Sequence, residues 1–316
     1  MTNPRHNWTL PEAQSLYELP FLELMYQAQT AHRAYFKSQT IQLASLYNVK
    51  TGACPEDCGY CAQSRHHNTN LKNEALVSLE STLEKAKEAK ANGATRFCMG
   101  AAWRTPKDHQ LNKMIEMIKE VKALGLETCA TLGMLTKDQA IALKEAGLDF
   151  YNHNLDTSPN YYPKVTQTRT YDDRLETLQH IRESGMKVCC GGILGMGESE
   201  QDRIELLLEL ANLPEHPESV PINHLEPIAG TPLGHSQKVP DLDFIRIIAL
   251  ARIMMPKTVI RLTAGRSRMS DTMQTLCFMA GANSIFIGAK LLTVNNASLN
   301  HDAHLLASLG LQPDVI

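Results

Sequence analysis

Three cysteines stand close together in the segment Thr51-Gly52-Ala53-Cys54-Pro55-Glu56-Asp57-Cys58-Gly59-Tyr60-Cys61. The next cysteine along the chain is Cys98, so the segment supplies no fourth thiolate. Iron-sulfur clusters usually take four cysteine ligands, and structural zinc sites close with four ligands. The spacing therefore indicates a metal site with one coordination position left open for a molecule that reacts there.

The pattern C-x3-C-x2-C with Tyr60 before its last cysteine resembles the signature of the radical S-adenosylmethionine (SAM) superfamily. The resemblance implies that Cys54, Cys58 and Cys61 hold a 4Fe-4S cluster and that Tyr60 lies at the cofactor site. The open iron would then bind the amino and carboxylate groups of SAM. The alternative is a zinc site that a distant Cys or His completes.

Composition restricts the class of partner. The chain has 316 residues, a hydrophobic content of 43% and a formal net charge of -3, so it can bury a sizeable core and has no field that attracts nucleic acid or an anionic membrane. Its first residues lack the apolar core of a signal peptide, and no apolar stretch is long enough to cross a bilayer. We expect a cytoplasmic protein whose cysteines serve as ligands or catalysts and whose partners are small molecules.

Short β-branched runs alternate eight times with helical periodicity, which predicts a single (β/α)8 barrel of the TIM type. The alternative architecture is an open doubly wound sheet. A helix that opens with the capping-box pattern Thr9-Leu10-Pro11-Glu12 precedes the first strand. We therefore expect an N-terminal helical extension over residues 1–40 and a barrel domain over residues 41–316. The expected strands cover residues 45–50, 96–100, 127–133, 149–156, 187–193, 220–225, 258–264 and 283–288.

A barrel brings the side chains of different strands into one lumen. Cys98, Cys129 and Cys189 fall in the second, third and fifth expected strands, and Arg261 falls in the seventh. Aliphatic side chains would fill a lumen better, so this set favours a second metal centre. Cys190 follows Cys189 directly, and since neighbours in a strand face opposite ways only one of them reaches the lumen.

The segment Tyr151-Asn152-His153-Asn154-Leu155-Asp156-Thr157 is unusually polar for a strand. Strand alternation would put Asn152, Asn154 and Asp156 on one face, where burial without partners costs about 2 kcal/mol or more per group. A ligand with hydroxyl, amide and carboxylate groups would satisfy them, whereas a turn capped by Asp156 is the structural alternative. Arg174 could bind a carboxylate with two nitrogens, although surface exposure is the common fate of a helix arginine.

Six segments, in order along the chain, resemble the biotin synthase family. They are Lys50–Cys58, Thr95–Trp103, Tyr151–Pro159, Glu218–Asn223, Ala251–Pro256 and Cys277–Ser284. The resemblance implies a sulfurtransferase that converts dethiobiotin to biotin by cleaving SAM and taking sulfur from a 2Fe-2S cluster. It also implies the following site: Cys98, Cys129, Cys189 and Arg261 on the 2Fe-2S cluster, Asn154, Asp156 and Arg174 at SAM, and Asn152 and Asn223 at dethiobiotin.

The same resemblance implies a homodimer and an electron donor such as flavodoxin or ferredoxin. Two other functions remain open from the sequence. One is another radical SAM enzyme such as a lipoyl synthase, which carries an additional N-terminal cysteine motif that is absent before Cys54 here. The other is a non-enzymatic iron-sulfur carrier, for which a full barrel with a polar lumen would be superfluous.

Overall fold

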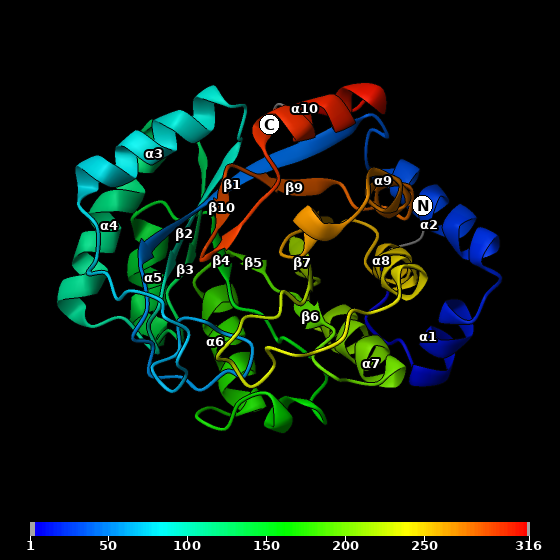
Figure 1. Cartoon of the computed structure of the whole chain (residues 1–316), viewed down its shortest axis with the longest axis horizontal. Helices are drawn as coiled ribbons and strands as arrows, with labels where there is room; N and C mark the ends of the chain where they lie inside the picture. Colours follow the sequence, from blue (N-terminus) through cyan, green and yellow to red (C-terminus); the bar gives the residue numbers. More distant parts are fainter. Residues whose placement is uncertain (1–3, 315–316) are drawn as a thin grey trace.

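A closed parallel barrel forms the body of the protein in this computed structural model, which describes residues 4–314. Its strands follow one another around the barrel in chain order, and the last strand pairs with the first (Figure 1). These strands are β1 (Thr40–Lys50), β2 (Arg96–Ala101), β3 (Glu127–Thr131), β4 (Phe150–Asn152), β5 (Lys187–Cys189), β7 (Ser219–His224), β8 (Val259–Leu262) and β9 (Ser284–Ile287). The barrel prediction is confirmed, and an open sheet is excluded because β1 pairs with both β2 and β9.

Helices follow the strands and surround the barrel (Figure 1). They are α3 (Leu79–Ala91), α4 (Asp108–Ala123), α5 (Lys137–Glu145), α6 (Tyr171–Glu183), α7 (Glu200–Ala211), α8 (Asp241–Met254), α9 (Asp271–Met279) and α10 (Leu299–Ser308). Capping boxes begin α5, α6 and α7, where Thr136, Thr170 and Ser199 each accept from the third helical amide. Gly281 follows α9 with φ 108°, and a Cβ there would lie 2.6 Å from Arg252 Cγ. Local sequence thus determines where these helices start and stop.

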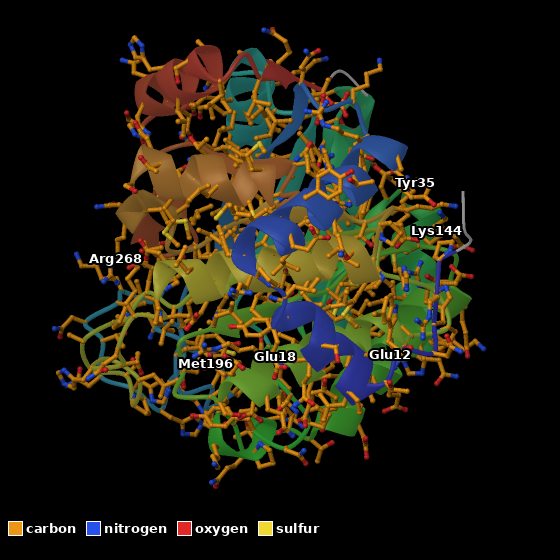
Figure 2. The ribbon with its side chains drawn as sticks, turned by 90° about the vertical axis from the view of Figure 1, so that its right-hand side faces the viewer. Glu12, Glu18, Tyr35, Lys144, Met196 and Arg268 are labelled. Atoms are coloured by element: carbon orange, nitrogen blue, oxygen red, sulfur yellow. The ribbon has the colours of Figure 1, made fainter. Side chains whose placement is uncertain are left out.

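Two helices precede the barrel, α1 (Leu10–Tyr17) and α2 (Phe21–Tyr35). The capping box predicted at Thr9 is present, because Thr9 and Glu12 exchange side-chain and backbone hydrogen bonds. Figure 2 shows α1, with Glu12 and Glu18, outside the barrel, and α2 packs against α8 and α9. The division into residues 1–40 and 41–316 stays a prediction, and residues 1–3 and 315–316 lie outside the described part.

The fourth and fifth strands differ from the expectation. The fourth ends at Asn152, not at Asp156, because the chain leaves the ladder and Asp156, with φ 69°, forms a separate bridge to Gly192. The fifth is interrupted after Cys189 and resumes as β6 (Gly192–Leu194), which pairs with β7. Gly191 lies at the break, where an added Cβ would stand 1.9 Å from the Pro221 carbonyl oxygen. Close backbone approach, and not strand alternation, therefore places residues 153–157.

Short elements complete the molecule. A hairpin of β10 (Lys290–Leu291) and β11 (Val294–Asn295) follows β9, and β12 (Gln312–Pro313) extends the sheet beside the start of β1. Among residues 4–314 no helix is both long enough and apolar enough to span a membrane.

Candidate active site

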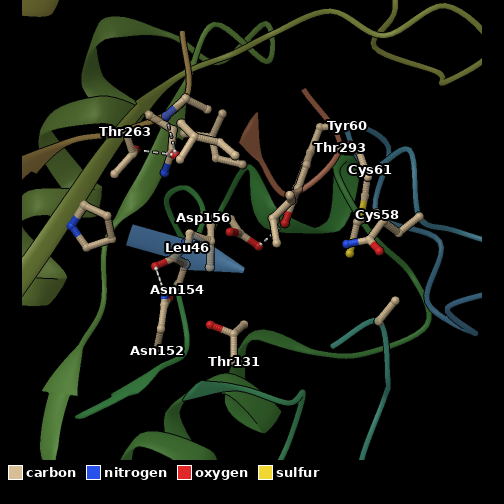
Figure 3. A pocket seen from close by; sticks show the side chains of 18 of the residues that line it. Leu46, Cys58, Tyr60, Cys61, Thr131, Asn152, Asn154, Asp156, Thr263 and Thr293 are labelled. Atoms are coloured by element: carbon tan, nitrogen blue, oxygen red, sulfur yellow. Dashed lines mark hydrogen bonds between the residues drawn. The ribbon is translucent and has the colours of Figure 1, made fainter. Parts of the chain in front are cut away.

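A cavity of about 320 Å³ opens where the barrel strands end, and every side chain to which the sequence assigned a site role lines it. The loop after β1, the segment after β4 and the β10–β11 hairpin contribute its walls. Figure 3 shows Cys58 and Cys61 at one side of the cavity, and Tyr60 reaching from that side toward Asp156. The roles of these residues remain predictions, but the structure does bring them together.

The loop that carries the cysteine triplet is held by backbone hydrogen bonds. Cys54 donates to Gln63 O at 2.9 Å, and Cys61 donates to Cys58 O at 2.9 Å. Burial, with the neighbouring Cys58, raises the pKa of Cys61 to about 12, and burial also raises the pKa of Cys54. Burial, and to a smaller extent the neighbouring cysteines, thus disfavour thiolate charge here, and a bound cation would compensate for it.

Asp156 is the centre of a buried polar network. Tyr60 Oη donates to its Oδ2 at 2.9 Å, and Arg174 donates to the same oxygen. Arg174 Nε in turn donates to Tyr162 Oη at 2.9 Å, and the Arg174 side chain is only 5% exposed. Asp156 does not cap the following turn, which was the alternative prediction from sequence, because the Asp156 carboxylate binds Tyr60 and Arg174 instead. Arg174 is therefore a buried partner of the pocket and not a surface arginine.

Three asparagines line the middle of the cavity, where Figure 3 shows Asn152 and Asn154 side by side. Asn154 Oδ1 accepts from Gly191 N at 3.1 Å, and Asn223 Nδ2 donates to Gly192 O at 3.0 Å. The side-chain oxygen of Asn152, Oδ1, is buried and has no hydrogen-bond partner within the described chain. An unpartnered buried acceptor costs about 1–3 kcal/mol, so this oxygen calls for a ligand with an N–H or O–H group.

A second group of cysteines lies inside the barrel. Cys98 and Cys129 stand opposite each other in the β2–β3 ladder, and Cys189 pairs with Asn152 in the β4–β5 ladder. The Cys129 thiol lies beside the other two, and this neighbour lowers the pKa of Cys98 and of Cys189, while they raise the pKa of Cys129. Arg261 is fully buried beside them, with Nε donating to Ser284 Oγ and Nη2 to Gln42 Oε1, both at 2.8 Å.

Cys190 lies on the other side of its strand. It packs in the core between the barrel and the helices, whereas Cys189 packs with Cys98 and Cys129 in the lumen. Burial raises the pKa of Cys190 far above its ordinary value. Cys190 directly follows β5 and its amide still donates to Ser219 O, so alternation at the end of the strand sends the two adjacent cysteines into different layers.

Sequence reasoning missed three buried residues of the site. Arg96 stacks 3.5 Å above the Phe150 ring, forms a 3.0 Å ion pair with Glu127, and has no hydrogen-bond partner for Nη1 among residues 4–314. His153 lines the cavity although strict alternation would turn it away, and Arg169 contacts Cys58. No local pattern marks these positions, since each reaches the site through tertiary packing.

Neither cysteine group is a preformed single-ion site. Within the described residues no set of three or more His, Cys, Asp or Glu side chains is arranged to hold one metal ion. A sulfide-bridged cluster is a larger body than one ion, so its thiolates need not converge on a point.

Comparison with known proteins matches two family models, the radical SAM superfamily over residues 48–210 and the biotin and thiamin synthesis associated domain over residues 221–312. The biotin synthase of Coxiella burnetii (strain RSA 493 / Nine Mile phase I) is 58% identical over 98% of this chain and 97% of its own. That of Pseudomonas aeruginosa (strain UCBPP-PA14) is also 58% identical, over 98% of this chain and 88% of its own. The chain belongs to the biotin synthase family.

Solved structures of two more distant proteins share the fold. Methylornithine synthase superposes with a TM-score of 0.82 at 20% identity, covering 97% of this chain and 94% of its own. The FeFe-hydrogenase maturase from Carboxydothermus hydrogenoformans superposes with a TM-score of 0.84 at 20% identity, covering 97% and 76%. As a biotin synthase family member the chain is a radical SAM enzyme, and that superfamily implies a 4Fe-4S cluster and SAM.

Replacing Asp156 by Ala leaves the buried Arg174 guanidinium without its carboxylate. Breaking a buried pair on one side costs about 3–5 kcal/mol, so the free energy of unfolding of the cluster-free protein should fall by that amount in urea denaturation. The control Asp138→Ala removes an exposed carboxylate from the first turn of α5 and should cost less than about 1 kcal/mol. Equal losses in the two variants would contradict the network described here.

Proposed function

We propose that the cavity performs radical SAM sulfur insertion, converting dethiobiotin to biotin. The proposal rests on one observation: two separate cysteine groups and the polar segment after β4 line the same cavity. A cluster carrier needs no such enclosed cavity. The lipoyl synthase alternative finds no support, because the relatives at 58% identity are biotin synthases.

The donor set at the first site fits a 4Fe-4S cluster. Cys54, Cys58 and Cys61 lie in one loop that hydrogen bonds hold, and all three line the cavity. Three thiolates leave one iron free for the amino and carboxylate groups of SAM. Tyr60, Asn154, Asp156 and Arg174 would bind SAM beside that iron, with Asp156 already oriented by the hydroxyl of Tyr60.

The donor set at the second site fits a 2Fe-2S cluster. Cys98, Cys129 and Cys189 are buried together in the lumen, and Arg261 lies beside them. The neighbouring Cys129 thiol lowers the pKa of Cys98 and Cys189 most, and Arg261 and Arg96 lower it further. Positive charge on these two arginines thus favours the thiolate forms that bind iron. We assign Arg261 as the fourth ligand from the resemblance to the biotin synthase family, and Ser284 and Gln42 hold its side chain in the cavity wall. As a ligand it would bind iron through a nitrogen that has lost its proton, and burial lowers the pKa of Arg261 in that direction.

Dethiobiotin would occupy the space between the two sites. Its ureido ring offers N–H donors and a carbonyl acceptor, which match the unpartnered Asn152 oxygen and the amide of Asn223. Asn152 stands opposite Cys189 in the β4–β5 ladder, and its side chain lies 3.5 Å from that of Asn154, so a substrate held by Asn152 would lie near residues of both sites. A substrate carbon held near both sites could lose hydrogen to the SAM-derived radical and then bond to sulfur from the second cluster.

Together the bound cofactors supply a 5′-deoxyadenosyl radical from SAM, which abstracts hydrogen, and a sulfide that bonds to the resulting carbon centre. The protein's own part is to bind and enclose. Residues Leu291–Val294 of the hairpin cover one side of the cavity and help exclude water from it. The asparagines orient the substrate, while the Tyr60–Asp156–Arg174 network keeps the SAM end rigid.

We also infer a cytoplasmic homodimer that receives its electron from flavodoxin or ferredoxin. Support for the dimer is the exposed pair Leu22 and Tyr26 on α2, which are 80% and 69% exposed and one helical turn apart. Sedimentation equilibrium should give twice the mass of the chain, and a monomer mass at micromolar concentration would contradict the inference.

Replacing Cys54, Cys58 or Cys61 by Ala should abolish cleavage of SAM, because two thiolates do not hold the cluster in a redox-competent state. The measurement is 5′-deoxyadenosine formation after anaerobic reconstitution and reduction, with dethiobiotin present and biotin assayed in parallel. Cys277→Ala is the matched control, since Cys277 is buried in the outer core and should leave cleavage intact. If any triplet variant still forms 5′-deoxyadenosine, the radical SAM site is misplaced.

The adjacent pair Cys189 and Cys190, at the end of β5, tests the second site. Cys189→Ala should lose the 2Fe-2S absorbance and biotin formation yet still cleave SAM at the other cluster. Cys190→Ser should keep both activities and lose only about 1 kcal/mol of stability, because Cys190 lies in the outer core. Reversed phenotypes would mean that the register of β5 is wrong by one residue.

A further inference from the structure

Arg169 lies beside the first cysteine group although no sequence pattern marks it. Its Nη2 donates to Cys58 Sγ at 3.1 Å, and its side chain is only 8% exposed. Its Nε has no hydrogen-bond partner among the described residues and stands 3.9 Å from the Glu56 carboxylate. A buried guanidinium thus directs its close contact at a sulfur and not at a carboxylate.

The residues on each side of Arg169 are anchored. The Thr168 amide donates to Asp57 Oδ1 at 3.2 Å, and the Asp57 amide donates to Thr168 Oγ1 at 3.2 Å, which ties this segment to the cysteine loop. Thr170 is the N-cap of α6 and exchanges hydrogen bonds with Asp173. The backbone at Arg169 is therefore fixed between the cysteine loop and a helix start, so its contact with Cys58 does not depend on the long side chain alone.

The carboxylates nearby are already engaged by other groups. Glu56 accepts from Arg104 Nη1 at 2.8 Å and from the Thr168 hydroxyl, and Asp156 accepts from Tyr60 and Arg174. Arg169 is therefore a cation that donates directly to the Cys58 sulfur, at a depth where solvent screens charge poorly, whereas Arg174 acts on Cys58 without a hydrogen bond to it. Hydrogen bonds to ligand sulfurs and nearby charge set the reduction potential of an iron-sulfur cluster.

We propose that Arg169 is a positioning residue for electron entry, which donates to the Cys58 sulfur and thereby raises the reduction potential of the 4Fe-4S cluster. The inference rests on the proposed function, since it needs a cluster on Cys58. Reduction adds one negative charge to the cluster, and the guanidinium stabilises the reduced form more than the oxidised form. Removal of Arg169 thus makes the cluster harder to reduce without removing any iron ligand.

The test is a redox titration of the reconstituted protein, followed by the electron paramagnetic resonance signal of the reduced 4Fe-4S cluster, with iron and sulfide measured on each sample. Arg169→Met should lower the ratio of reduced to oxidised cluster about tenfold at a fixed solution potential, which is about 59 mV for a one-electron couple. Arg169→Gln keeps an N–H donor without the charge. Because charge-assisted hydrogen bonds are roughly twice as strong as neutral ones, its ratio should fall only about threefold.

Arg65→Met is the matched control, because Arg65 follows the same cysteine loop but its side chain is exposed, so its charge is screened. The ratio in this variant should stay within about twofold of the wild-type value. A wild-type midpoint in Arg169→Met with full iron content would overturn the proposal, as would an equal fall in Arg65→Met. If Arg169→Met does not take up the cluster, a wild-type midpoint in Arg169→Gln overturns it instead.

The wild-type sample separates this inference from the proposed function. If the wild-type protein forms no 4Fe-4S cluster or does not cleave SAM, the proposed function fails and the role of Arg169 fails with it. If the wild-type protein does both while the Arg169 variants keep its midpoint, the role of Arg169 alone is wrong.

Discussion

Hydrogen bonding between β1 and β9 closes the parallel sheet, and the rest of the structure depends on that closure. In a closed parallel barrel all strands end at the same mouth, so loops that are distant in sequence meet there. The cysteine loop after β1 meets residues 153–157 after β4 and the hairpin after β9 in this way. An open sheet would leave β1 and β9 at opposite edges, and the cavity would have no wall between them.

Buried charge is the second constraint, because the lumen holds several ionisable groups that are costly to take out of water. The buried arginines among these groups have specific partners. Arg174 pairs with Asp156, and Arg96 pairs with Glu127. Gln42 donates to Glu127 at 3.3 Å and accepts from Arg261 at 2.8 Å. These pairs hold cations near both cysteine groups. Thiolates and clusters of negative charge are stabilised in such surroundings, which connects the electrostatics of the barrel to its chemistry.

Much of the site could be predicted from sequence, although for different reasons at different residues. Cys54, Cys58 and Cys61 are close in the chain, so their spacing alone indicates a shared site. Cys98 and Cys129 could be placed together because parallel register and barrel order bring neighbouring strands side by side. The segment after β4 is a different case: alternation predicted Asn154 and Asp156 in the cavity, but they reach it after the strand has ended, through the bridge of Asp156 to Gly192.

The sequence by itself determined the alternation of strands and helices, the cysteine triplet and the family, because periodicity, capping and ligand spacing are local properties of the chain. Tertiary structure alone decided which side chains complete the site. Arg169 contacts Cys58 across 111 positions in the chain, and Arg96 faces cysteines from three strands. Such contacts follow from the packing of the barrel and from the pairing of buried charges. Both join residues that are far apart in the chain, so the spacing of neighbouring residues does not reveal them.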